Sequence, residues 1–272
     1  MTAMRRPAPA TVRRLILVLI LMLWEQVPQT GLLAELFLPS LSKTLTVLVQ
    51  NWEEYAEALF VTLYEVAAAM LIACGVGILI GALVGGLAVL RNLLLPVFSS
   101  LYAVPIVILY PIFTAWFGIG SESKIAFAGV YGFFPVMLST AAGIQSIDQN
   151  FLVAARSMGA SLPQQITRVI IPASIPTVLS GLRLGGALAI IGVVVSEMLT
   201  AAAGIGYLVS KYRTVLDSPR VFAAILMILV LSVLFDMLAR WVERRTLVWQ
   251  TAGRRERAAA REGTLVSAPA PA

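Results

Sequence analysis

The chain has 272 residues, of which 59% are hydrophobic and only 12% charged, and its mean hydropathy is +0.90. Soluble domains carry about 25% charged residues, so this chain has too few polar side chains to cover a water-facing surface, and a soluble globular domain is excluded. A single cysteine, Cys74, and the absence of histidine exclude a disulfide framework, a His/Cys metal site and histidine-based catalysis. The composition is that of a polytopic membrane protein.

The first part of the chain predicts one membrane span and an external loop. Residues 1–14 form a basic head, and an apolar run follows at residues 15–24. A run of ten apolar residues is short for a span and is also the length of a signal-peptide core. No small-x-small cleavage site follows where one is expected, so we favour an uncleaved span at about 12–33 over a cleaved signal. Residues 15–58 would then hold this span and the external loop.

Five further apolar stretches predict six transmembrane helices in all, with both termini on one side of the membrane. Residues 91–92 are expected to form a tight turn, and the span after it is interrupted by three prolines. Residues 59–242 form the predicted transmembrane domain. The Arg-rich and then Ala/Pro-rich residues 243–272 form a tail expected to be disordered. The five stretches are 59–90, 93–117, 124–143, 178–199 and 221–241.

Three glycines of the second predicted span are spaced four residues apart. Gly77, Gly81 and Gly85 therefore share one helix face, on which another helix can approach closely. Such a face can serve packing within a subunit or association between subunits. We interpret it as packing within the subunit.

The distribution of Lys and Arg predicts the orientation. Of the 20 Lys and Arg residues, 15 fall on the side that holds both termini and residues 148–176. Because the richer side of a membrane protein faces the cytoplasm, both termini and residues 148–176 are expected there. The net charge of +6 then reflects membrane orientation, and no nucleic-acid partner is expected.

Residues 145–176 are predicted to form a cytoplasmic loop between two apolar runs, and residues 148–176 are its polar part. Asp148 can cap a first helix, and Gly159 is a typical residue just beyond a helix end. The pair Ser161 and Gln164 has the spacing of a capping box for a second helix.

The first helix of this segment has an apolar stripe, and prolines follow the second helix. Phe151, Ala155 and Met158 are spaced to form one narrow apolar stripe on the first helix. Pro172 and Pro176 are expected to end the second helix. The segment could lie on the membrane surface as an amphipathic helix or meet a partner in water, and we favour the partner.

This segment resembles the EAA loop of ABC importer permeases, whose pattern is E-A-A-x-x-x-G, nine residues, then I-x-L-P. The chain has Val153-Ala154-Ala155, Gly159 after three residues and, after nine more, V-I-I-P ending at Pro172. Every spacing matches. Val153 replaces the glutamate of the pattern, so the chain lacks the acid that this position supplies in the family.

Residues 116–125, 133–148, 180–185 and 196–209 resemble the nitrate/sulfonate/taurine branch of these permeases. The resemblance implies an all-α, MetI-like type I importer fold with a cytoplasmic coupling helix. It implies a transport subunit rather than an enzyme. This subunit would move nitrate, a sulfonate such as taurine or a related small organic compound inward. The driving force would be ATP hydrolysis on a separate subunit.

The resemblance also implies a set of partners in the bacterial cytoplasmic (inner) membrane. These are a dimer of cytoplasmic ABC ATPases, a second permease subunit that forms a homodimer, and a periplasmic or extracellular solute-binding protein. ATP and Mg would bind to the ATPase, and no cofactor is expected here, since the chain has no phosphate-cradling G-x-x-x-x-G-K-[ST] loop. The residues implied to couple to the ATPase are Phe151, Val153, Ala154, Ala155, Met158, Gly159, Ala160 and Pro172.

Several polar residues lie in or beside predicted spans, where ionisable groups are functional candidates. Glu197 is a candidate for the solute path or gate, whereas Glu65 could reach the outer interface and Asp236 could pair with Arg240. Further candidates for the path or gate, or for a packing kink, are Tyr102, Pro105 and Tyr110. Candidates for contact with the binding protein, or for a solvated surface, are Lys211, Tyr212 and Arg213.

Two other functions compete with that of an ABC permease. A secondary transporter or channel that works without ATP is disfavoured, because intramembrane charges are sparse and no internal repeat is evident. A membrane-bound enzyme would need a cluster of catalytic groups, which the sequence does not contain.

Overall fold

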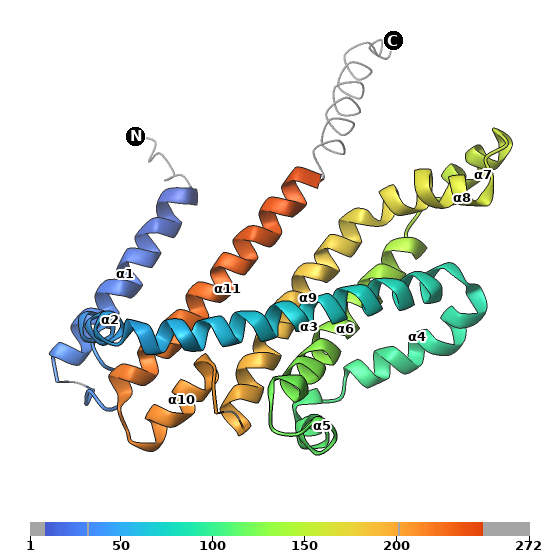
Figure 1. Ribbon diagram of the computed structural model, residues 1–272. Helices are drawn as coiled ribbons and strands as arrows, with labels where there is room; N and C mark the ends of the chain where they lie inside the picture. The colour runs from blue at the N-terminus through green and yellow to red at the C-terminus, as the bar shows by residue number, and fades with distance from the viewer. Residues whose placement is uncertain (1–8, 32, 201, 247–272) are drawn as a thin grey trace, which may run out of the picture. The chain divides into compact units, whose positions relative to one another are not determined.

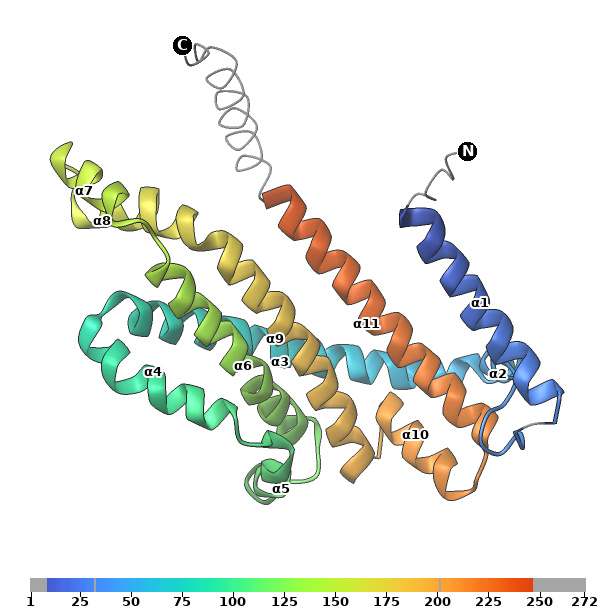
Figure 2. The same ribbon diagram turned by 180° about the vertical axis from the view of Figure 1, so that it is seen from behind.

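The computed structural model describes residues 9–31, 33–200 and 202–246, and all regular structure in these ranges is helical (Figures 1 and 2). Residues 1–8 of the predicted head and 247–272 of the predicted tail lie outside the described residues, and 243–246 continue the last helix. The elements are α1 (Pro9–Gln29), α2 (Leu41–Gln50), α3 (Trp52–Gly86), α4 (Ala88–Tyr102), the 3-10 helix η1 (Ile106–Leu109), α5 (Tyr110–Phe117), α6 (Ser121–Gln145), α7 (Gln149–Ser157), α8 (Leu162–Gln165), the π-helix η2 (Ile166–Ile170), α9 (Ile171–Thr200), α10 (Ile205–Thr214) and α11 (Ser218–Thr246).

The predicted all-α polytopic architecture is confirmed. Among the described residues, α3, α6, α11 and the helical stretch that contains α9 are long and apolar enough to cross a membrane, and α4 with the segment 106–117 is a fifth candidate broken at residues 103–105. The remaining predicted span corresponds to α1, whose 21 residues include Arg13, Arg14 and Glu25.

Two compact units contain these helices. Unit 1 comprises Met1–Ala68, Leu109–Phe127 and Ile191–Leu231, and unit 2 comprises Ala69–Ile108, Ala128–Ile190 and Ser232–Ala272. The long helices α3, α6, α9 and α11 each contribute residues to both units.

The break after α3 falls earlier than the predicted turn. Leu87 has extended backbone angles (φ −108°, ψ 114°), and Arg91 lies inside α4. The predicted turn at residues 91–92 is therefore wrong. Gly85 and Gly86 precede the break, and consecutive glycines weaken a helix because they lose the most backbone freedom when it forms.

In unit 2 the glycine face of α3 packs against α6, which confirms packing within the subunit. A Cβ atom built on Gly81 would lie 2.5 Å from the carbonyl oxygen of Met137, and one built on Gly77 or Gly85 would lie 2.8 Å from the nearest atom of α6. Helix α6 also meets α9, where a Cβ atom on Gly185 would lie 2.7 Å from the carbonyl oxygen of Gly132. The backbone of α6 is thus in direct contact with two neighbouring helices.

Candidate functional site

The first helix of the 148–176 segment, α7, is capped at both ends as predicted. The backbone N–H of Asn150 donates to Asp148 Oδ1 at 2.9 Å. Gly159 follows the helix with φ +74°, and Ala160 N–H donates to the carbonyl oxygen of Ala155 at 3.0 Å. This pairing is a Schellman motif, for which glycine is favoured because its φ is positive. Gly159 therefore forms the turn between α7 and α8.

The second helix of the segment begins as predicted, but it does not end at the predicted prolines. Ser161 N–H donates to Gln164 Oε1 at 2.8 Å, so the capping box forms. Pro172 and Pro176 do not end the helix, which is a correction, because the chain continues through η2 into α9 and holds Pro176 inside it. The i→i+5 turns of η2 lie directly before Pro172, where a regular α-helix would press the proline ring against an earlier carbonyl.

The three residues of the predicted apolar stripe of α7 differ in burial. Phe151 and Met158 are 55% and 81% exposed, whereas Ala155 is buried at 5%. Ala155 therefore holds the segment together, and Phe151 and Met158 are the groups that a partner can reach. Val153, which replaces the glutamate of the EAA pattern, is also exposed.

A groove of about 600 Å³ runs beside α7 within unit 2. Arg168 lies at this groove and is exposed, and no ion pair joins it to any residue that the structure describes. Of the residues implied to couple to an ATPase, Ala154 and Gly159 are exposed while Ala160 and Pro172 are partly buried. The groove is lined by Ser146, Ile147, Asp148, Phe151, Ala154, Ala155, Met158, Arg168, Val169, Pro172 and Ala173.

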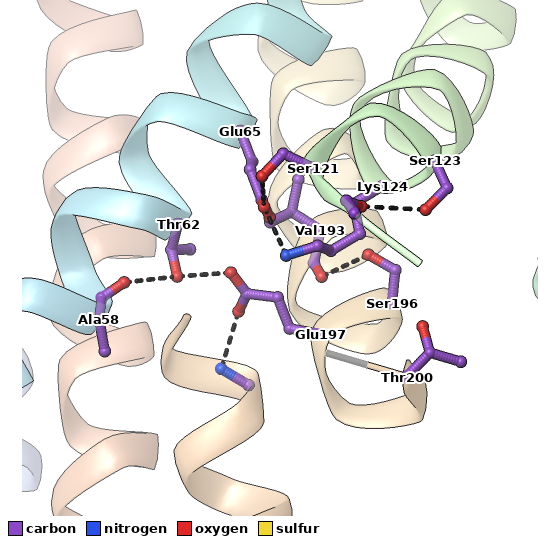
Figure 3. A network of polar contacts seen from close by, with 12 residues as sticks. Ala58, Thr62, Glu65, Ser121, Ser123, Lys124, Val193, Ser196, Glu197 and Thr200 are labelled. Atoms are coloured by element: carbon purple, nitrogen blue, oxygen red, sulfur yellow. Dashed lines mark hydrogen bonds and ion pairs between the residues drawn. The ribbon is translucent and has the colours of Figure 1, made fainter. Parts of the chain in front are cut away.

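A second site is a buried polar cluster in unit 1 (Figure 3). Lys124 Nζ of α6 lies 2.5 Å from Glu65 Oε1 of α3, and the hydroxyl of Ser121 donates to the same oxygen at 2.7 Å. Glu65 is fully buried, so its side chain does not reach the protein surface. The other oxygen, Glu65 Oε2, has no hydrogen-bond partner in the described structure.

Glu197 of α9 occupies the other half of this cluster. Thr62 Oγ1 donates to Glu197 Oε1 at 2.7 Å, and the backbone N–H of Gly206 in α10 donates to Glu197 Oε2 at 2.8 Å (Figure 3). Thr62 Oγ1 also accepts from the backbone N–H of Ile205 at 2.9 Å. The carboxylate therefore joins three helices. At 1% exposure it does not line an accessible path in this structure.

The other candidates for a solute path are divided between the two units. Tyr110 is buried in unit 1, where its hydroxyl lies 2.6 Å from Thr200 Oγ1. Tyr102 belongs to unit 2 and stacks on Phe134, with ring centroids 6.0 Å apart. Pro105, also in unit 2, is exposed. No single unit therefore brings together the four predicted residues.

The three candidates for contact with a binding protein differ in exposure. Tyr212 is buried in the core of unit 1, and its hydroxyl donates to Glu54 Oε2 at 2.5 Å. Lys211 Nζ lies 2.6 Å from Glu54 Oε1 and is exposed, as is Arg213. Lys211 and Arg213 are thus the two members that reach the surface.

The pairing of Asp236 with Arg240 is confirmed, and a third residue joins it. Arg183 Nε of α9 donates to Asp236 Oδ1 at 2.7 Å. Arg183 was missed by sequence reasoning, as were Thr62 and Lys124, because their partners are far away along the chain. For Arg183 and Lys124 the available signal was a charged residue next to or within an apolar stretch, whereas the uncharged Thr62 carried no such signal.

Comparisons with known proteins fit this architecture. The family model described as "Binding-protein-dependent transport system inner membrane component" matches residues 73–248. The Bacillus subtilis protein named as an aliphatic sulfonates transport permease, SsuC, is 32% identical over 85% of this chain and 84% of its own length. The taurine transport system permease protein TauC of Escherichia coli is 32% identical over 86% and 87%.

A solved structure shows the same fold. A chain of the MetNI methionine ABC transporter, in an inward-facing conformation, superposes with a TM-score of 0.62 at 16% identity over 70% of this chain and 95% of that chain. The family match and the relatives together establish that this chain belongs to the binding-protein-dependent transport system inner membrane components, as a permease subunit of an ABC importer.

Proposed function

We propose that this permease imports a small sulfonate or a closely related organic compound across the bacterial inner membrane. The chain is a transport subunit and not an enzyme, and a separate ATPase of the importer hydrolyses ATP. The solute class is supported by the two relatives named for aliphatic sulfonates and taurine, each aligned over more than four fifths of this chain. Importers of this family work with an ATPase and a solute-binding protein.

The assembly that we propose contains two copies of this chain, two ATPases and one binding protein. Both termini and the 148–176 segment face the cytoplasm, which is supported by the placement of 15 of the 20 Lys and Arg residues on that side. ATP and Mg bind only to the ATPases. The binding protein meets the opposite face, where Lys211 and Arg213 are exposed.

The observation that carries the proposed coupling to an ATPase is the geometry of the 148–176 segment. α7 is held by a cap at each end, its buried Ala155 packs inside the segment, and its exposed Phe151 and Met158 face outward. The helical chain continues from α8 through η2 into α9. A displacement of α7 by a closing ATPase can therefore be transmitted to a spanning helix.

Replacing Met158 with glutamate is expected to weaken binding of the ATPase at least about tenfold, because a charge would have to be desolvated in an apolar contact. The measurement is copurification and titration of the ATPase against permease in nanodiscs. Val215→Glu is the control, since Val215 is also an exposed apolar residue but follows α10 in unit 1. Equal ATPase affinity of the Met158→Glu and unsubstituted permeases would contradict docking through α7.

The transported solute is tested by reconstitution. Proteoliposomes that contain the permease, its ATPase and its binding protein are expected to accumulate a labelled sulfonate only when ATP is supplied on the ATPase side. Thermal-shift screening of the binding protein against sulfonates, nitrate and aromatic acids identifies the solute beforehand. Uptake that proceeds without ATP would reject the importer mechanism, and a binding protein that ignores sulfonates would reject the solute class.

A further inference from the structure

The start of α10 is held by two side chains from other helices. The backbone N–H of Ile205 donates to Thr62 Oγ1 of α3 at 2.9 Å, and that of Gly206 donates to Glu197 Oε2 of α9 at 2.8 Å. The first N–H groups of a helix have no partner within the helix. Here the carboxylate of Glu197 and the hydroxyl of Thr62 supply those partners. A carboxylate at this position is also favoured by the helix dipole.

The chain before and within α10 is shaped to receive the Glu197 carboxylate. A Cβ atom on Gly204, whose φ is +102°, would lie 2.0 Å from Glu197 Oε1. A Cβ atom on Gly206 would lie 2.3 Å from the carbonyl oxygen of Val194. Neither position has room for a side chain, so the two glycines bring the backbone of α10 onto α9. All of these groups belong to unit 1.

We propose that Glu197 is a positioning residue for transport, which latches α10 to α9 and α3 and keeps the outer side of the permease closed until the binding protein docks. This inference rests on the proposed function and on its orientation, in which α10 lies on the side of the binding protein. The latch consists of one carboxylate that accepts two hydrogen bonds, from Thr62 and from Gly206.

The latch lies on α9, the helix that would transmit motion from the ATPases. α9 is one helix from Ile171 to Thr200, and it begins directly after η2 and the 148–176 segment. Glu197 lies in its last turn. A shift or rotation of α9 moves the carboxylate away from Thr62 and Gly206, which frees the N–H group of Gly206, while the N–H group of Ile205 still donates to Thr62 of α3. Release of α10 and movement of the docking segment would thereby be coupled.

Two substitutions of Glu197 separate its hydrogen bonds from its charge. In Glu197→Gln the amide oxygen can accept from Gly206, and the amide nitrogen can donate to Thr62 Oγ1. The Thr62 hydroxyl then donates to the carbonyl oxygen of Ala58, which already lies 3.1 Å away. Glu197→Ala removes both hydrogen bonds. The control is Ser196→Ala, because Ser196 is equally buried on α9 but donates only to the local carbonyl oxygen of Val193 at 2.7 Å.

Release of α10 is measured as the accessibility of a cysteine in α10 to labelling. Leu208 of α10 is buried, so Leu208→Cys in a Cys74→Ala background is expected to react slowly with a membrane-impermeant maleimide. Adding Glu197→Ala is expected to raise the labelling rate at least about tenfold, the effect of losing the hydrogen bond from α10 to a carboxylate. Glu197→Gln and Ser196→Ala are expected to leave the rate within about twofold.

The consequence for transport is read from ATP hydrolysis by the permease–ATPase complex in nanodiscs. Glu197→Ala is expected to raise hydrolysis in the absence of binding protein several-fold, with little further stimulation when the binding protein is added, whereas Glu197→Gln keeps normal stimulation. Unchanged labelling or unchanged basal hydrolysis in Glu197→Ala would overturn the latch. Failure of the binding protein to stimulate the unsubstituted complex would instead overturn the proposed function.

Discussion

Replacing Lys124 with methionine is expected to destabilise the permease by roughly 3–5 kcal/mol, the usual cost of removing one partner from a buried ion pair. Lys124 and Glu65 are both almost inaccessible, and their Nζ and Oε1 atoms lie 2.5 Å apart. Without the ammonium group, the hydroxyl of Ser121 is the one donor that Glu65 keeps among the described residues. Its charge would then be buried without compensation, or it would have to take up a proton.

The measurement is the midpoint of thermal unfolding of a fluorescent permease fusion, followed by size-exclusion chromatography in detergent. The matched control is Lys211→Met, since Lys211 and Glu54 also join α3 to another helix at 2.6 Å but are 42% and 33% exposed. A pair of this kind contributes about 0–1 kcal/mol. Adding Glu65→Gln to Lys124→Met is expected to recover most of the loss. Equal effects of the two lysine substitutions, or no recovery in the double variant, would contradict a stabilising buried pair.

The 148–176 segment could be predicted because its signals are local. The cap at Asp148, the left-handed residue at Gly159 and the box at Ser161 each involve residues within a few positions of one another, and each forms as expected. The burial of Ala155 could not be predicted in the same way. Helical spacing places it in one stripe with Phe151 and Met158, and only the position of the following segment decides which members are covered.

The buried polar cluster could not be predicted, because its pairs are distant along the chain. Thr62 is 135 residues from Glu197, and Ser121 is 56 residues from Glu65. Sequence identifies an acid in an apolar stretch as unusual, but it does not supply the partner. Helix ends were a second difficulty. The two prolines at the start of α9 indicated a break, yet the π turn before them lets the helix continue.

Replacing Gly81 with alanine is expected to destabilise the permease by about 1–3 kcal/mol, although alanine is the better helix former by about 1 kcal/mol. The new Cβ atom would lie 2.5 Å from the carbonyl oxygen of Met137 and 2.7 Å from Thr140 Cβ. Both atoms belong to or lie next to the backbone of α6, so neither can rotate away. The two helices would have to separate, which forfeits the close packing that stabilises helix pairs in a bilayer.

Gly75→Ala is the matched control, because it makes the same chemical change on the same helix where no atom lies within 4 Å of the new Cβ. It is expected to leave the unfolding midpoint unchanged or to raise it slightly, since only the helix propensity changes. The contrast isolates contact with α6 from the conformational freedom of glycine. If Gly81→Ala were as well tolerated as Gly75→Ala, the glycine face would not be held against α6. It would then be free to meet a second subunit, which is the association that packing within the subunit excludes.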